Sequence, residues 1–333
     1  MKAMVLNRPA DVSAQPLSLR DCPVPVPGPG QVRIAVHACG VCRTDLHIVE
    51  GDLPPHTLPI IPGHMVIGHI DTLGDGCPHR FLQQRVGVGW LASTCGQCGF
   101  CRTGRENLCP AARFTGYDLD GGYASYLIAD AGYIYTIPDQ FADLQAAPLL
   151  CAGIIGYRSL QRANVPPGGT VALYGFGSAA HLILQIVRHR GCQACVVTRS
   201  RSHQHLARDL GAVWAGENPE DLPGPADAAI LFAPAGPLVP PALKNLRPGG
   251  TLSLAGIHMS PIPQLDYHQH LYHERELRST MNNTREDTRH LLAEAAQAGV
   301  QAHIQTYDLQ DANRALADMK ASRFDGTAVL VPV

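Results

Sequence analysis

The chain has 333 residues, of which 45% are hydrophobic and 16% are charged, and its formal net charge at pH 7 is −2. A chain of this length and apolar content is expected to form about two globular domains, which excludes an intrinsically disordered protein. The near-zero net charge gives no electrostatic reason to expect nucleic acid or an anionic membrane as a partner.

The N-terminal segment MKAMVLNRPA contains no apolar core of signal-peptide length. No apolar run reaches the roughly 20 residues that a membrane-spanning helix needs. We therefore expect a soluble, cytoplasmic protein. In a reducing cytosol, the eleven cysteines are expected to serve metal binding or catalysis rather than disulfide formation.

The first part of the chain has the pattern of short strands separated by rigid turns. Strand-like runs at 4–6 and 32–36 lie on either side of the proline- and glycine-rich segment 23–30, which excludes helix and central strand there. Glycine and proline stay frequent up to about residue 90, which is typical of a β-rich region with many loops.

Four cysteines follow closely on one another in the pattern C-x2-C-x2-C-x7-C: Cys95, Cys98, Cys101 and Cys109. The short spacers allow the thiolates to turn inward on one loop and to bind zinc as a tetrahedron. A ferredoxin-type iron–sulfur cluster is the alternative, because a proline, Pro110, follows the last cysteine, but that motif has three residues before its last cysteine instead of seven. Four thiolates leave no open position on the metal, so this zinc is expected to be structural.

Strand and helix patterns alternate from about residue 150, which is typical of a doubly wound parallel sheet. Strands are expected at 170–174, 194–198, 228–232 and 251–255. The apolar residues between 179 and 187 recur at helical spacing, and Gly191 stands where that helix should end.

The turn between the first of these strands and its helix carries the pattern G-x-G-x-x-A, formed by Gly175, Gly177 and Ala180. The glycines permit a tight turn and a close approach of a dinucleotide pyrophosphate, whose charge the helix N-terminus favours. The pattern alone is weak, since an ordinary tight turn has the same residues, but its place between strand and helix favours a nicotinamide cofactor site.

The second strand ends in Thr198, Arg199 and Ser200. An enzyme that uses NAD(H) usually carries an acidic residue there for the ribose hydroxyl groups, whereas a basic or hydroxyl side chain suits the 2′-phosphate of NADP(H). NADP(H) is therefore favoured over NAD(H). The alternative is a solvated basic loop without a ligand.

The last part of the chain is expected to contain a helix at 285–298, a strand near 301–306, a helix near 309–320 and a strand at 328–331.

Three short segments occur together with the four-cysteine lobe. They are G-V-C-R-T-D-L-H at 40–47 and P-G-H at 62–64, which precede the lobe, and L-C-A-G at 150–153, which follows it. Together these motifs resemble the zinc-containing alcohol dehydrogenases of the medium-chain dehydrogenase/reductase superfamily, along almost the whole chain. The resemblance implies an α/β fold in which a β-rich, GroES-like catalytic domain (1–152 with the structural zinc lobe at 90–110, and 284–333) is interrupted by a Rossmann cofactor domain (153–283).

By this resemblance, Cys42, His64 and Cys151 hold a catalytic zinc, which makes two zinc ions per chain. Three protein ligands leave a fourth position for water or the substrate oxygen. The implied activity is transfer of a hydride between a small alcohol or aldehyde and the nicotinamide, with zinc polarising the substrate oxygen.

The same resemblance implies roles for the residues that follow the first ligand. Thr44 would take the proton of the alcohol, His47 would carry it to solvent, and Asp45 would orient a zinc ligand. A surface loop with a turn-forming aspartate is the alternative for this segment.

The resemblance also implies that Arg43 contacts the pyrophosphate, that Arg285 lies near the cofactor, and that Trp90 narrows the substrate pocket in favour of small or unbranched alcohols and aldehydes. A surface ion pair for Arg43 and core packing for Trp90 are the alternatives. A homodimer or homotetramer is expected by analogy.

One position departs from the family pattern. Relatives usually have glutamate directly after the histidine ligand, whereas this chain has Met65. The site is expected to assemble with altered turnover or metal exchange. A weakly catalytic cofactor-binding protein of the same fold is the alternative that this residue supports, and a polyol dehydrogenase is another, against which Cys151 argues because those relatives use glutamate there.

Overall fold

The computed structural model describes residues 1–332, and the chain forms two compact units. Unit 1 consists of Met1–Cys151, Asn282–Ala296 and the chain from Ala302 onward, and unit 2 consists of Ala152–Met281 and Gln297–Gln301. The described residues include no helix that is long and apolar enough to span a membrane.

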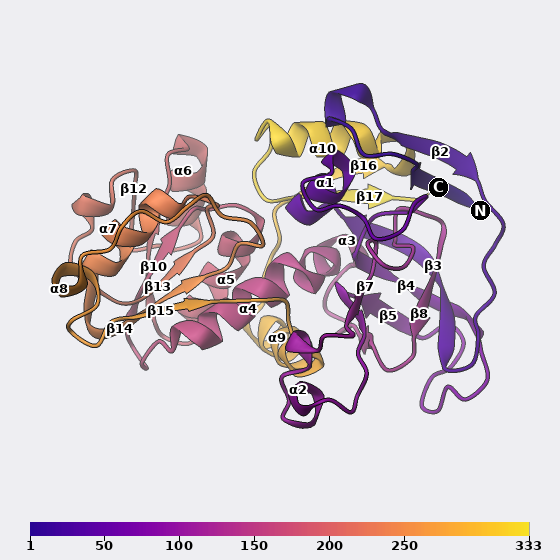
Figure 1. The fold of residues 1–333 in the computed structure, drawn as a ribbon, viewed down its shortest axis with the longest axis horizontal. Helices are drawn as coiled ribbons and strands as arrows, with labels where there is room; N and C mark the ends of the chain where they lie inside the picture. Colours follow the sequence, from indigo (N-terminus) through magenta and orange to yellow (C-terminus); the bar gives the residue numbers. More distant parts are fainter. Residues whose placement is uncertain (333) are drawn as a thin grey trace. The chain divides into compact units, whose positions relative to one another are not determined.

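Unit 1 is built on a seven-stranded sheet with the order β16-β17-β3-β4-β5-β9, in which β8 also pairs with β3 (Figure 1). These strands are β3 (Gln31–Gly40), β4 (Met65–Leu73), β5 (Arg85–Val88), β8 (Tyr126–Asp130), β9 (Ile134–Thr136), β16 (Ile304–Asp308) and β17 (Thr327–Val331). Two small antiparallel pairs accompany them: β1 (Lys2–Leu6) with β2 (Leu17–Asp21), and β6 (Leu91–Ser93) with β7 (Arg113–Phe114). The helices of this unit are α1 (Arg43–Glu50), α2 (Gly99–Arg102), α3 (Asp143–Ala146), α9 (Arg285–Ala298) and α10 (Ala312–Lys320).

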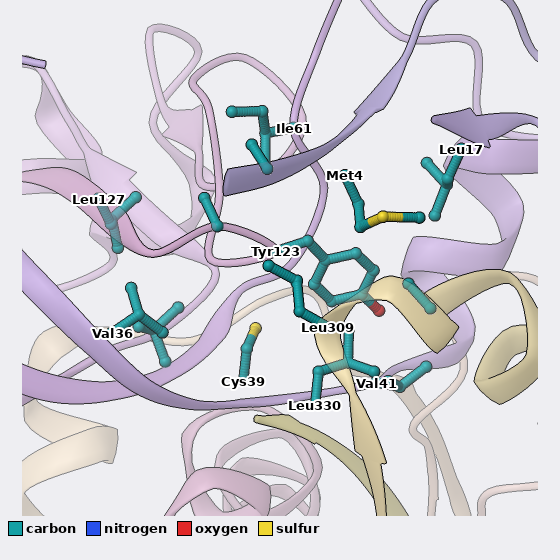
Figure 2. Packing of buried hydrophobic residues seen from close by; sticks show 14 of the residues in the cluster. Met4, Leu17, Val36, Cys39, Val41, Ile61, Tyr123, Leu127, Leu309 and Leu330 are labelled. Atoms are coloured by element: carbon teal, nitrogen blue, oxygen red, sulfur yellow. The ribbon is translucent and has the colours of Figure 1, made fainter. Parts of the chain in front are cut away.

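Strand β3 shows why these residues form a half-buried sheet. Val32, Ile34 and Val36 are buried and alternate with more exposed residues, which is the two-residue period of a strand with one face on a core. Figure 2 shows part of that core, in which the ring of Tyr123 lies among aliphatic side chains contributed by strands far apart in the sequence. Strand β3 ends at Gly40, so the packing of this strand fixes the backbone two residues before Cys42.

Unit 2 is a six-stranded parallel sheet with the order β12-β11-β10-β13-β14-β15. In chain order this is 3-2-1-4-5-6, the dinucleotide-binding arrangement, whose switch point lies between β10 and β13. The strands are β10 (Thr170–Tyr174), β11 (Gln193–Val197), β12 (Trp214–Gly216), β13 (Ala226–Leu231), β14 (Leu246–Leu254) and β15 (Glu276–Ser279). The helices are α4 (Ala152–Ala163), α5 (Ser178–His189), α6 (Arg201–Asp209), α7 (Val239–Lys244) and α8 (Tyr267–His270).

The expected α/β fold class, a GroES-like sheet unit and a Rossmann-like parallel sheet, is confirmed. The strand expected at 170–174 and the helix at 285–298 have the predicted bounds. The strand expected near 301–306 lies instead at Ile304–Asp308, because its pairing with β17 sets the register from Ile304 opposite Thr327. The helix expected near 309–320 begins with one 3₁₀ turn at Leu309–Asp311, as is common at helix ends.

Candidate functional site

Cys42 is positioned by the beginning of helix α1. It has an extended backbone and stands at the N-cap, and the carboxylate of Asp45 accepts the Cys42 N–H at 2.8 Å. An acidic residue in the first turn satisfies an N–H group that has no partner within the helix and suits the helix dipole. The cap therefore fixes the backbone from which the Cys42 thiol extends.

The three predicted ligands of the catalytic metal come together within unit 1. The Sγ atoms of Cys42 and Cys151 are 3.6 Å apart, and Nε2 of His64 lies 3.3 Å from Sγ of Cys151. With Zn–S near 2.3 Å and Zn–N near 2.0 Å, a tetrahedral ion requires S···S of about 3.8 Å and N···S of about 3.5 Å. These two distances thus lie within about 0.2 Å of the values that zinc requires, and the three ligand atoms all lie within 4.8 Å of one another, so the residues present fit the ion.

Asp45 holds this group of ligands together from behind. Its side chain is fully buried, its Oδ1 lies 2.9 Å from Nδ1 of His64, and it accepts hydrogen bonds from the N–H of Gly63 at 3.2 Å and the hydroxyl of Tyr123 at 3.2 Å. A carboxylate on the far nitrogen of a metal-binding histidine fixes the ring and directs Nε2 toward the metal. This geometry matches the orienting role expected for Asp45.

The protonation states of the three ligand side chains depend on one another. Hydrogen bonding between the two thiols lowers the pKa of Cys42 well below its ordinary value and raises that of Cys151. Burial disfavours a charged His64, but the Asp45 carboxylate and the Cys42 thiolate outweigh it and raise the pKa of His64 to about 10. A metal ion that binds here therefore replaces protons, so acid weakens its binding.

Three further predicted residues lie on helix α1. Thr44 is buried, with its Oγ1 3.7 Å from Sγ of Cys42. His47 lies one turn further along, half-buried, and its Nδ1 is 2.9 Å from Oδ2 of Asp52. Arg43 is exposed and forms no ion pair among the described residues.

Trp90 borders the ligand group through its ring. The indole lies edge-on to the imidazole of His64, with centroids 4.8 Å apart, and stacks on Phe114 with centroids 5.0 Å apart. Tyr117 extends the same aromatic surface, with its ring centroid 5.9 Å from that of Trp90. The indole can therefore restrict space beside the ligands, as expected for a wall of a substrate pocket.

Met65 is buried, at 1% exposure, as the first residue of β4. It pairs with Gly40 of β3, and a Cβ added at Gly40 would lie 2.8 Å from the Met65 methyl carbon. The thioether of Met65 thus packs against Gly40 and fills the space that a side chain there would occupy. A side chain larger than that of glycine at position 40 would require Met65 to move.

The four cysteines of the lobe also converge within unit 1. The Sγ–Sγ distances are 3.5 Å for Cys95–Cys109, 3.5 Å for Cys98–Cys101 and 3.9 Å for Cys95–Cys101. These values lie close to the roughly 3.8 Å between sulfur atoms around a tetrahedral zinc. Backbone N–H groups of Gln97 and Cys98 lower the pKa of Cys95 to about 6, which favours the thiolate that a metal binds.

Arg285 is engaged by Glu106, which directly precedes the last turn of this lobe. Nη2 donates to Oε2 of Glu106 at 2.7 Å, Nε donates to both oxygens, and the Arg285 N–H donates to Oε1 at 2.8 Å. The guanidinium also covers the Tyr133 ring at 4.6 Å. These contacts connect α9 to the lobe, and they leave Nη1 for the cofactor contact that remains a prediction.

In unit 2 the glycine turn follows β10 at the switch point of the sheet. Gly175 has φ +91°, a conformation that favours glycine, and a Cβ there would lie 3.0 Å from the Ala233 nitrogen. No atom lies within 4 Å of the place where a Cβ at Gly177 would stand. Ala180 is fully buried in α5, whose N-terminus has no side-chain cap. The turn therefore has room for a pyrophosphate at the N-terminus of α5, where the helix dipole favours negative charge.

The end of β11 carries the residues predicted to select the cofactor. The Thr198 carbonyl accepts from Gln204 at 2.8 Å, and Ser200 caps α6 by accepting the His203 N–H at 3.3 Å. Arg199 is exposed and forms no ion pair among the described residues. Of these residues, Arg199 has the side chain most available to a ligand.

Sequence reasoning missed the partners that support the site. Tyr123, Phe114 and Glu106 contact Asp45, Trp90 and Arg285, respectively. No local spacing indicates these pairs, because each joins segments that only the folded sheet brings together. Leu46 and Ile48 of α1 lie in the hydrophobic core of unit 1.

The comparisons with known proteins agree with this architecture. A family model described as alcohol dehydrogenase GroES-like domain matches residues 28–139. The chain is 47% identical over 336 residues to a probable alcohol dehydrogenase AdhA of Mycobacterium tuberculosis (99% of this chain, 97% of the relative), and 35% identical over 341 residues to an alcohol dehydrogenase of Geobacillus stearothermophilus (99% and 98%).

Solved structures show the same fold over the full length. AibC superposes with a TM-score of 0.91 at 27% identity, covering 100% of this chain and 96% of the other. Cinnamyl alcohol dehydrogenase SbCAD4 of Sorghum bicolor gives 0.88 at 25% identity, covering 99% and 97%. Fold and site thus define a two-unit oxidoreductase with a GroES-like catalytic unit. The chain belongs to the alcohol dehydrogenases of the medium-chain dehydrogenase/reductase superfamily.

Proposed function

We propose that this alcohol dehydrogenase is zinc-dependent, prefers NADP(H) and interconverts small alcohols and aldehydes. The observation that carries the proposal is the group formed by Cys42, His64 and Cys151, whose ligand atoms have the spacing of a tetrahedral zinc with one position left open. When bound, zinc supplies a Lewis acid that polarises the substrate oxygen, and the nicotinamide supplies or accepts the hydride.

The side chains of α1 are proposed to move the proton. Thr44 Oγ1 lies beside the Cys42 sulfur, on the helix turn that faces the ligands. His47 follows at the i+3 position, where side chains of a helix are neighbours, and it is half-buried beside the exposed Asp52. A hydroxyl near the ligands and an imidazole nearer to solvent form the two ends of a proton path.

The same site opposes the alternative of a weakly catalytic cofactor-binding protein. That alternative rests on Met65, which fills the space over Gly40 and leaves the three ligands, Asp45 and Thr44 in place. The two zinc sites per chain are proposed from the two ligand groups, and homo-oligomerisation and the domain bounds 1–152, 153–283 and 284–333 are proposed from the family resemblance.

The proposed function is tested by metal content and turnover in one preparation. We expect two zinc ions per chain and oxidation of NADPH with a short aldehyde, faster than oxidation of NADH at equal concentration. A chain that holds one zinc ion and turns over neither cofactor would contradict the proposal, since the four-cysteine lobe alone would then bind metal.

Replacing Arg199 with alanine is expected to raise KM for NADPH by roughly tenfold or more, because a charge-assisted hydrogen bond to phosphate contributes about 1.5–3 kcal/mol. KM for NADH should stay within about twofold, since NADH lacks the 2′-phosphate. Steady-state kinetics with both cofactors measures this. Arg201→Ala, an exposed arginine in the first turn of α6, is the control. An unchanged NADPH KM in Arg199→Ala would show that Arg199 is only a solvated surface residue.

A further inference from the structure

Two histidines approach each other on the exposed face of the unit 1 sheet, away from the ligands described above. His37 lies on β3 and His69 on β4, and Nε2 of His37 is 3.4 Å from Nδ1 of His69. Their ring centroids are 4.6 Å apart. We call His37 and His69 the outer histidine pair.

A β-bulge places His37 there. The pairing of β3 with β4 shifts register between Val36 and Ala38, so His37 is the extra residue of the bulge. A bulge redirects one side chain and is often found beside functional sites. The residues on either side, Val36 and Ala38, are buried, whereas the His37 side chain is 42% exposed.

A carboxylate orients the imidazole of His37. Oδ2 of Asp143, at the start of α3, lies 3.0 Å from Nδ1 of His37. Asp143 is itself fixed, because its Oδ1 accepts from Nε of Arg85 at 2.7 Å, and Arg85 also donates to the Phe141 carbonyl. With Nδ1–H donated to Asp143, Nε2 of His37 is the nitrogen without a proton, and it is the atom that lies 3.4 Å from Nδ1 of His69. This is the carboxylate–histidine arrangement that supports metal-binding histidines.

We propose that the outer histidine pair is a third metal site, which takes a divalent ion of the zinc class through Nε2 of His37 and Nδ1 of His69. Two nitrogens on a tetrahedral zinc with Zn–N of 2.0–2.1 Å stand about 3.3–3.4 Å apart. The observed 3.4 Å matches that spacing, and it is longer than the usual hydrogen bond of about 2.9–3.0 Å. Water completes the coordination, and with only two protein ligands the ion exchanges more readily than at the cysteine-containing sites.

The strands that carry this pair lead to two of the proposed catalytic ligands. Strand β3 ends at Gly40, two residues before Cys42, and β4 begins at Met65, directly after His64. A bound ion would connect these two strands on their exposed face. We therefore expect the melting temperature of the protein to rise with the concentration of the free ion, because an ion that binds only the folded state stabilises it by RT ln(1 + [L]/Kd).

Equilibrium dialysis of the holoenzyme against free Zn²⁺ tests the site. The wild type should bind one further zinc per chain beyond the two held by the cysteine-containing sites, and its melting temperature should rise with added Zn²⁺. His37→Gln and His69→Gln should each lose the further equivalent and the thermal shift while keeping the two tightly held ions, which also shows that the variants fold. His290→Gln, an exposed histidine on α9, should behave as wild type.

Two results would overturn the proposal. The first is failure of the wild type to bind further zinc at free Zn²⁺ concentrations at which a pair of free imidazoles binds the ion. The second is a further equivalent that persists in both His37→Gln and His69→Gln, which would place it elsewhere on the surface. Neither result bears on the proposed function, because neither histidine belongs to the catalytic ligands.

Discussion

Cys42→Ala is expected to reduce the zinc content from two ions per chain to one and to lower kcat/KM by about three orders of magnitude. The substitution removes one of three ligands and leaves His64 and Cys151, which bind the ion too weakly to retain it in protein purified without added zinc. A metal Lewis acid contributes several kcal/mol to the transition state, and each 1.36 kcal/mol is about tenfold in rate. Zinc analysis and steady-state kinetics on the same preparation measure the two effects.

The matched control is Cys39→Ala, which changes a fully buried cysteine on β3 that is outside the ligand group. This variant should keep both zinc ions and activity near that of the wild type, with a small loss of stability from the missing sulfur. Equal loss of zinc in Cys39→Ala and Cys42→Ala would show that any change in this segment disrupts the unit. Full activity in Cys42→Ala would exclude the proposed catalytic ligand set.

The four-cysteine ligand group could be predicted because its members lie close together in the sequence. Two-residue spacers place Cys95, Cys98 and Cys101 on one loop, so the fourth cysteine was the only long-range element. The parallel sheet of unit 2 could be predicted for a related reason, since buried strands such as 170–174 are short apolar runs that alternate with helical periodicity. Cys42, His64 and Cys151 needed the family resemblance, because nothing between them in the sequence indicates that they meet.

The partners that complete the site could not be predicted from spacing. Tyr123 lies in the loop before β8 and donates to Asp45 of α1, and only the folded unit, with Tyr123 in its core, brings these segments together. Met65 illustrates the same limit. Its sequence position suggests a missing carboxylate, whereas the structure adds that the thioether packs over Gly40. Met65 therefore differs from the glutamate of the family pattern in two ways: it carries no negative charge, and its side chain packs against Gly40.

Asp45→Asn is expected to lower both zinc affinity at the catalytic site and kcat/KM by about 10- to 100-fold, the usual effect of removing a carboxylate behind a metal-binding histidine. Asp45 faces only donors: the N–H groups of Cys42 and Gly63, the Tyr123 hydroxyl and Nδ1 of His64. An amide presents one oxygen and an NH₂ to the same donors, so at least one buried donor loses its acceptor, and the ring of His64 loses the charge that makes Nε2 a better ligand. Competition with a chelator measures the affinity, and steady-state kinetics measures kcat/KM.

Tyr123→Phe separates this electrostatic effect from simple packing. It removes one donor from Asp45 and keeps the carboxylate, the aromatic ring and the other three contacts, so zinc affinity and kcat/KM should change by no more than a few-fold. If Asp45→Asn matched Tyr123→Phe in both measurements, the charge of Asp45 would play no part in holding the metal, and hydrogen bonds alone would orient His64. A large loss of zinc affinity in Asp45→Asn with a small loss in Tyr123→Phe would instead show that the site depends on the charge of Asp45, a buried residue that is not itself a zinc ligand.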